Sequence, residues 1–142
     1  MLRDLVGPHA RRLAVAGSAL GWVLVARASQ RLPGLTLPQT EVWLDQLARA
    51  LPKLSGLPIA EAARAITAAA RRVSGTRCLA WSLALRGLLA QAGIAAELRI
   101  GVAASGPGRF QAHAWVQAGG QSWSFAADAE DYSVLRPRAA TG

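Results

Sequence analysis

The sequence contains one cysteine and two histidines, and this scarcity limits the chemistry open to the protein. A lone cysteine cannot form an internal disulfide. Cys78, His9 and His113 together cannot build a zinc site of the usual four-ligand kind without carboxylates or a partner chain. We therefore expect neither a metal nor a cofactor. Most lone cysteines are packing residues, so the role of Cys78 depends on its surroundings.

Acidic residues are also scarce. The chain has 8 Asp and Glu residues and 16 Lys and Arg residues, so its formal net charge is +8. Such a surface attracts anionic partners, among them acidic peptides, nucleic acid and anionic membranes. The basic residues are scattered and are not interleaved with aromatic residues, so we expect no nucleic-acid binding. A solvated basic surface is the plainer explanation.

A long hydrophobic run is missing, although 52% of the residues are apolar. The longest apolar stretch, residues 13–26, is shorter than the roughly 20 residues that a spanning helix needs. It follows two arginines and ends in small residues, the order of a secretory signal. The helical spacing of Leu13, Leu20 and Leu24 favours instead a buried or membrane-leaning helix. We therefore expect a cytoplasmic protein, with a peripheral membrane contact left open.

The first two thirds of the chain show helical periodicity. Thr40 is a candidate N-cap for the second helix, and Pro58 fits the first turn of the third. Ser74 or Thr76 can cap the fourth helix, which places Cys78 in its first turn. We expect helices over about residues 9–30, 40–51, 58–73 and 77–91.

In the last third of the chain, apolar and polar residues alternate with a period of two. We expect strands over about residues 94–102, 110–118 and 121–125, with a turn at residues 105–108 and a hairpin turn at Gly119–Gly120. Helices followed by an antiparallel meander indicate an α+β fold, in which the helix that carries Cys78 packs on a small sheet. We expect one domain over residues 1–142, with residues 1–55 as a helical N-terminal extension of a core over residues 56–142.

Cys78 and His113 can form a nucleophile and its base. The first turn of a helix places unpaired backbone N–H groups at the sulfur, where they stabilise a thiolate and can hold an oxyanion. His113 shares one strand face with Gln111 and Trp115. Its imidazole meets the thiol if that face packs on the Cys78 helix. The alternative for His113 is a hydrogen-bonded histidine on a sheet face.

Three segments carry a resemblance to a known family. Residues 76–85 (TRCLAWSLAL), residues 93–102 and residues 112–116 (AHAWV) resemble the lasso peptide biosynthesis B2 proteins, over about residues 74–125. The resemblance implies a transglutaminase-like, papain-like core and a cysteine peptidase that removes the leader from a lasso precursor. It assigns Cys78 as the nucleophile and His113 as the general base.

The same resemblance implies partners. The substrate is the leader-bearing precursor peptide, and a separate B1 protein recognises the leader. The freed core amine passes to an asparagine-synthetase-like cyclase that uses ATP. We expect no cofactor in the peptidase itself.

Two positions depart from the family pattern. Trp81 stands where the family often has Arg, and Phe125 or its neighbour stands where the family has the catalytic Asp. Asp128 is our candidate for the third catalytic residue, with Asp131 as second choice. The alternative is that both belong to a solvated acidic turn.

Two other functions share these residues. One is a non-catalytic module that binds the precursor peptide. The other is an acyl-transferring or amidase relative that uses the same Cys78–His113 dyad on another substrate.

Overall fold

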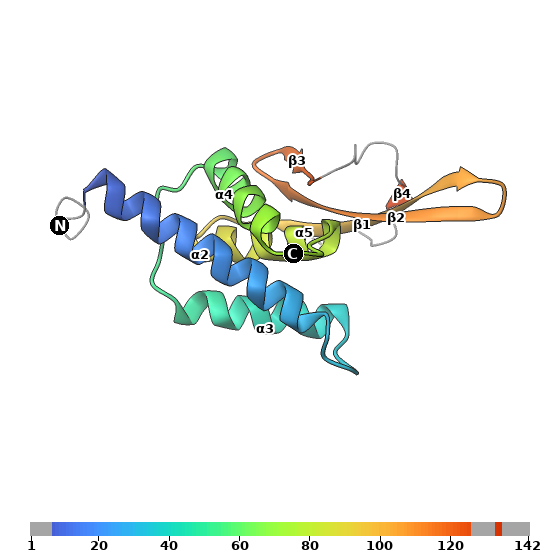
Figure 1. The fold of residues 1–142 in the computed structure, drawn as a ribbon, viewed down its shortest axis with the longest axis horizontal. Helices are drawn as coiled ribbons and strands as arrows, with labels where there is room; N and C mark the ends of the chain where they lie inside the picture. The colour runs from blue at the N-terminus through green and yellow to red at the C-terminus, as the bar shows by residue number, and fades with distance from the viewer. Residues whose placement is uncertain (1–6, 126–132, 135–142) are drawn as a thin grey trace.

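The computed structural model describes residues 7–125 and 133–134, without the side chains of residues 103–105 and 133–134. Within this part of the chain, four helices precede the strands of one sheet, so the predicted α+β arrangement is confirmed (Figure 1). The helices are α2 (Pro8–Ser29), α3 (Leu37–Ala50), α4 (Ile59–Arg72) and α5 (Cys78–Gln91), and the strands are β1 (Glu97–Gly106), β2 (Arg109–Ala118), β3 (Gln121–Trp123) and β4 (Ser133–Val134).

Helix α2 matches the predicted helix, but its buried stripe differs from the leucine stripe of the sequence pattern. Leu13 and Leu24 are 74% and 51% exposed. The buried face is formed by residues between the leucines, namely Val15, Ala19, Trp22, Val23 and Ala26. Small side chains on this face let α2 approach its neighbours closely. No helix in the described part of the chain is long and apolar enough to cross a membrane.

Helix α3 begins at Leu37, three residues before Thr40, the expected N-cap. Thr36 is the cap: its hydroxyl accepts a hydrogen bond from the Gln39 N–H, and the Gln39 side chain accepts one from the Thr36 N–H. This reciprocal pair is a capping box. Pro38 within the first turn costs nothing, because the N–H that proline lacks has no helical acceptor there. The cap prediction at Thr40 is therefore wrong.

Helix α5 is the central helix. Most of its side chains are buried, and α2, α3 and α4 pack around it while β2 lies along another side (Figure 1). It begins at Cys78 with Arg77 as N-cap, so neither Ser74 nor Thr76 caps it. The Thr76 hydroxyl donates instead to the Val73 carbonyl at the end of α4. Gly93 follows the helix end with a φ of 76°, the left-handed conformation that glycine favours.

The described strands form an antiparallel sheet in the order β3-β2-β1-β4. β1 starts and ends later than the predicted first strand, and β3 is two residues shorter than predicted. The hairpin turn at Gly119–Gly120 is confirmed, with φ values of 60° and 75°. The β1–β2 hairpin extends beyond the helices at one end of the molecule (Figure 1).

One face of the sheet closes the core. Leu98 of β1 and Ala114, Val116 and Ala118 of β2 belong to the hydrophobic core that includes the buried side chains of the helices. Leu98 pairs with Val116, so both side chains lie on the same face. Successive side chains of a strand point to opposite faces, and the residues between these therefore lie on the other face.

Candidate active site

Cys78 is the first residue of α5, and its thiol is free and partly exposed. Arg77 before it has extended backbone, with φ −115° and ψ −179°, and its carbonyl accepts the first helical hydrogen bond from the Trp81 N–H. The N–H groups of the first turn have no acceptor within a helix. In the described part of the chain no side chain caps this start. Those N–H groups can therefore receive an anion beside the sulfur.

His113 lies in the middle of β2 and is buried, with 4% of its surface exposed. Its backbone pairs with Gly101 of β1, which has no side chain to crowd the ring. The imidazole stacks on the indole of Trp115, with the ring centroids 6.1 Å apart and the planes 18° apart. The imidazole is thus packed beside the Trp115 side chain.

Cys78 and His113 lie on neighbouring elements, since α5 packs along β2. Cys78 packs against the core that Ala114 and Val116 close, whereas His113 and Trp115 alternate with them along β2. Trp115 is buried, yet it is not part of that core. Among the hydrogen bonds of the described residues, none joins Cys78 to His113. A direct contact between the thiol and the imidazole therefore stays a prediction.

The residues proposed as the third catalytic group, Asp128 and Asp131, lie outside the described residues. Phe125 precedes them, and it or its neighbour is the position at which the sequence resemblance leads us to expect an Asp. Its ring stacks on Trp81 of α5, with centroids 5.9 Å apart and planes 18° apart. Phe125 is thus in contact with Trp81, the other position at which the sequence departs from that resemblance. Nothing in the sequence predicted this contact beyond the aromatic character of both residues.

A cavity of about 480 Å³ lies between α4, α5 and β3, one helical turn from Cys78. We call it the α4–β3 cavity. The residues that line it are Ala60, Ala63, Arg64, Thr67, Ala68, Arg71, Trp81, Trp123 and Ser124. Trp123 is one of three aromatic residues, with Trp115 and Phe125, for which the sequence left open a role in the core or in peptide binding; the α4 residues of the lining were not candidates. The usable signal was the spacing of Arg64, Thr67, Ala68 and Arg71, which places them on one side of a helix.

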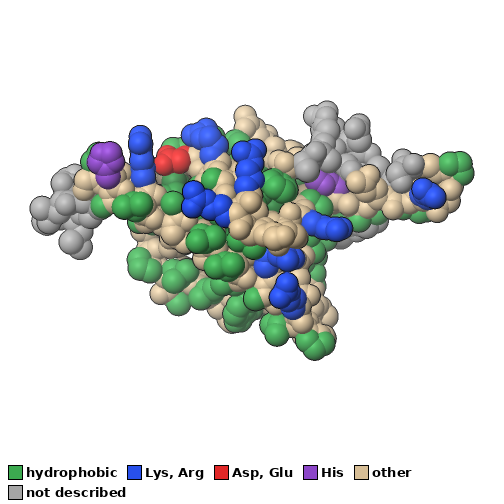
Figure 2. Space-filling model, in the orientation of Figure 1, with side chains coloured by type: hydrophobic (Ala, Val, Ile, Leu, Met, Phe, Trp, Pro, Cys, Tyr) green, Lys and Arg blue, Asp and Glu red, His purple; other side chains and the backbone are tan. Residues whose placement is uncertain are grey.

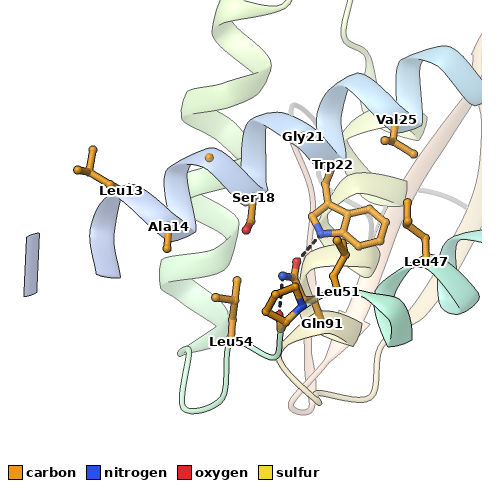
Figure 3. A pocket seen from close by; sticks show the side chains of 12 residues that line it. Leu13, Ala14, Ser18, Gly21, Trp22, Val25, Leu47, Leu51, Leu54 and Gln91 are labelled. Carbon is orange, nitrogen blue, oxygen red and sulfur yellow. Dashed lines mark hydrogen bonds between the residues drawn. The ribbon is translucent and has the colours of Figure 1, made fainter. Parts of the chain in front are cut away.

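A second cavity, of about 540 Å³, lies between α2 and α3 and contains neither Cys78 nor His113 (Figure 3). Trp22 and Gln91 meet in its wall. Gln91 accepts a hydrogen bond of 2.8 Å from the Trp22 indole and donates one of 2.8 Å to the Pro52 carbonyl. This arrangement ties α2, α5 and the end of α3 together.

Among the described residues, no three His, Cys, Asp or Glu side chains are grouped so that they could hold a metal ion.

Comparison with known proteins gives a family but no individual relative. A comparison with curated proteins found no match, and neither did one with solved structures. The model of the Transglutaminase-like superfamily matches residues 8–136, nearly the whole chain. This superfamily includes cysteine peptidases and acyltransferases. The match covers α2 to β4, and with it Cys78 at the start of α5 and His113 on β2. The chain belongs to the transglutaminase-like superfamily.

Proposed function

We propose that this protein is a cysteine peptidase that removes the leader peptide from a lasso peptide precursor. The observation that carries the proposal is the position of Cys78: a free, partly exposed thiol on the first residue of a helix whose start no described side chain caps. The resemblance of residues 76–85 and 112–116 to lasso B2 proteins supports the choice of substrate.

The reaction would proceed through an acyl-enzyme. The Cys78 thiolate attacks the carbonyl carbon at the leader–core junction, and N–H groups of the first turn of α5 hold the oxyanion. His113 takes the thiol proton and gives it to the departing core amine as the C–N bond breaks. The leader is then a thioester on Cys78. Water attacks this thioester with His113 as base, which releases the leader carboxylate and restores the thiol.

This mechanism requires His113 to approach Cys78 in the complex with substrate, since the two are not hydrogen-bonded without it. Catalytic hydrogen bonds are often long or misaligned before substrate binds. We propose Asp128 as the group that orients the imidazole, with Asp131 as the alternative.

The proposed reaction also needs other proteins. A separate B1 protein would present the leader, and an asparagine-synthetase-like cyclase would use the freed core amine. We place these steps in the cytoplasm, with peripheral contact between the basic surface and an anionic membrane as part of the proposal.

The test is cleavage of a lasso precursor peptide by the purified protein in the presence of its B1 partner, followed by mass spectrometry. We expect leader removal by the wild type and a loss of at least a hundredfold in rate for Cys78→Ala and for His113→Ala. Far-ultraviolet circular dichroism checks that each variant is folded. Full activity in either folded variant would reject the proposed dyad.

Two features favour a second function: no hydrogen bond joins Cys78 to His113 among the described residues, and Phe125 or its neighbour stands where the resemblance leads us to expect an Asp. A module that only binds the precursor would have these features. Iodoacetamide labelling near neutral pH separates the two functions, because an activated thiol reacts quickly and a packing cysteine does not. An acyl transferase would instead join the leader to an added amine, which the same mass spectra would show.

A further inference from the structure

We propose that the α4–β3 cavity binds an extended segment of the peptide substrate in which an apolar side chain lies next to a carboxylate. This inference rests on the proposed function, since it names the substrate feature that the peptidase recognises. It rests on three observations: a rigid aromatic wall, a basic rim, and the short path to Cys78.

The aromatic wall is formed by Trp81 and Trp123. The Trp81 indole N–H donates to the Thr67 hydroxyl at 3.0 Å, and the Trp123 N–H donates to the Ala118 carbonyl at 3.1 Å. Phe125 stacks against Trp81 and fixes its ring further. Trp81 is buried, with 2% of its surface exposed, and backs the cavity. Trp123 is partly exposed, and because its indole N–H is satisfied within the protein, its ring presents apolar surface at little entropic cost. This wall suits an apolar side chain.

The basic rim is formed by Arg64 and Arg71, which are exposed and lie two turns apart on α4. Among the described residues that line the cavity, none is acidic. Within the described part of the chain, neither guanidinium is within salt-bridge distance of a carboxylate. Figure 2 shows basic side chains gathered over α4 and few acidic ones on the same face. Guanidinium groups bind carboxylates in a bidentate fashion, so an acidic side chain fits this rim.

The path from the cavity to the sulfur is short. Trp81 follows Cys78 by three residues in α5, so the two side chains are neighbours on one side of the helix. An extended peptide covers about 3.3 Å per residue, and a segment in the cavity that Trp81 backs therefore reaches Cys78 within a few residues. Ligand sites typically have volumes of about 300–1,000 Å³, and the volume of this cavity lies within that range. It can therefore select the residues beside the cleaved bond.

The test measures binding without cleavage. Full-length Cys78→Ser protein is applied to an array of alanine octapeptides whose two central positions are varied among Phe, Leu, Glu, Gln and Lys. We expect peptides that combine Phe or Leu with Glu to be retained at least fivefold more than those with Gln or Lys in place of Glu. Equal retention of the Glu, Gln and Lys peptides would overturn the inference.

Variants at Ala68 test whether the peptide binds in the α4–β3 cavity. Ala68 is exposed, lines the cavity between the two arginines in sequence, and tolerates Glu or Lys as helix formers. We expect Ala68→Glu to reduce retention of the Phe-Glu peptide at least fivefold, whereas Ala68→Lys keeps or raises it. Arg64→Gln and Arg71→Gln should each weaken binding of the Phe-Glu peptide two- to fivefold. Arg49→Gln, on the exposed side of α3, is the matched control and should leave binding unchanged.

The outcomes separate this inference from the proposed function. If Ala68→Glu leaves peptide binding unchanged while wild-type protein cleaves its precursor, the inference fails and the peptidase stands. If Ala68→Glu abolishes binding but Cys78→Ala cleaves normally, the cavity stands and the catalytic proposal fails. If a single-stranded oligonucleotide or vesicles of phosphatidylglycerol, but no Glu peptide, bind in an Ala68-dependent way, the peptide assignment is overturned.

Discussion

A single missing side chain permits the close contact between α2 and α5. A Cβ atom added at Gly87 would lie 2.7 Å from Cδ2 of the Trp22 indole, and closer still to two other ring carbons. The indole is fixed by its hydrogen bond to Gln91, so it cannot move aside without breaking that bond. Gly87 is therefore required by packing and not by backbone conformation.

We predict that Gly87→Ala destabilises the protein by about 2 kcal/mol. Alanine improves the helix propensity by about 1 kcal/mol, but overpacking a core costs about 1–3 kcal/mol, and here the clash is with a rigid ring. Urea unfolding monitored by circular dichroism gives the free energy. The matched control is Gly21→Ala on α2, where nothing lies within 4 Å of the added Cβ. That change should stabilise the protein by about 0.5–1 kcal/mol; equal effects would contradict the packing argument.

The sequence predicted which residue types carry the proposed chemistry, but not how they face each other. The helical break before residue 77 placed Cys78 in a first turn, because breakers and periodicity are local signals. The face of His113 depends on strand register, where a shift of one residue moves every side chain to the opposite face. Alternation alone could not tell whether the Ala114 or the His113 face meets α5.

Among the secondary-structure elements, α3 shows how a local signal can be assigned to the wrong residue. Thr36 and Thr40 are both of a residue type that caps helices, and Leu37–Pro38 lies between them. Proline is suited to a first turn, and Gln39 completes a capping box only with Thr36. The helix therefore starts earlier than expected. Leu44 lies in the core, whereas Trp43 is 44% exposed.

We predict that Thr36→Ala destabilises the protein by about 1 kcal/mol, the usual cost of losing an N-cap. Thr40→Val should cost less. The Thr40 hydroxyl only donates to the Thr36 carbonyl, which also accepts from the Thr40 backbone N–H at 2.9 Å and so keeps a partner. Thermal unfolding of both variants measures the two losses of stability. A larger loss for Thr40→Val than for Thr36→Ala would contradict the assignment of Thr36 as the N-cap.

The molecule as a whole is held together by polar ties between helices as well as by its core. Arg86 of α5 forms a bidentate pair with Asp45 of α3, at 2.9 and 3.0 Å, and its Nε lies 3.5 Å from the buried Glu41 carboxylate. This cluster joins α3 to the helix that carries Cys78. No sequence pattern predicted it, because the partners are more than 40 residues apart.

We predict that Arg86→Leu destabilises the protein by about 3 kcal/mol, since it removes the cation beside a buried carboxylate. Asp45→Asn should cost no more than about 1 kcal/mol, because Asp45 is 35% exposed and its charge is screened by solvent. The readout is again urea unfolding. Similar losses in the two variants would show that the buried Glu41 does not depend on Arg86.

The architecture was predictable from the sequence because each element has a local period, and the family match over residues 8–136 agrees with it. The cavities were not predictable from the sequence, since they arise where α4 meets β3 and where α2 meets α3. Their walls combine residues from distant parts of the chain, and only the packed helices bring them together.

The central claim is that Cys78 becomes acylated by the leader. The most direct measurement is the intact mass of the protein, quenched in acid during turnover of a lasso precursor with its B1 partner. The account predicts a species heavier by the leader acyl group, with the added mass on Cys78, and unmodified protein with uncut precursor for Cys78→Ala. Release of the leader by folded Cys78→Ala at the wild-type rate would contradict it.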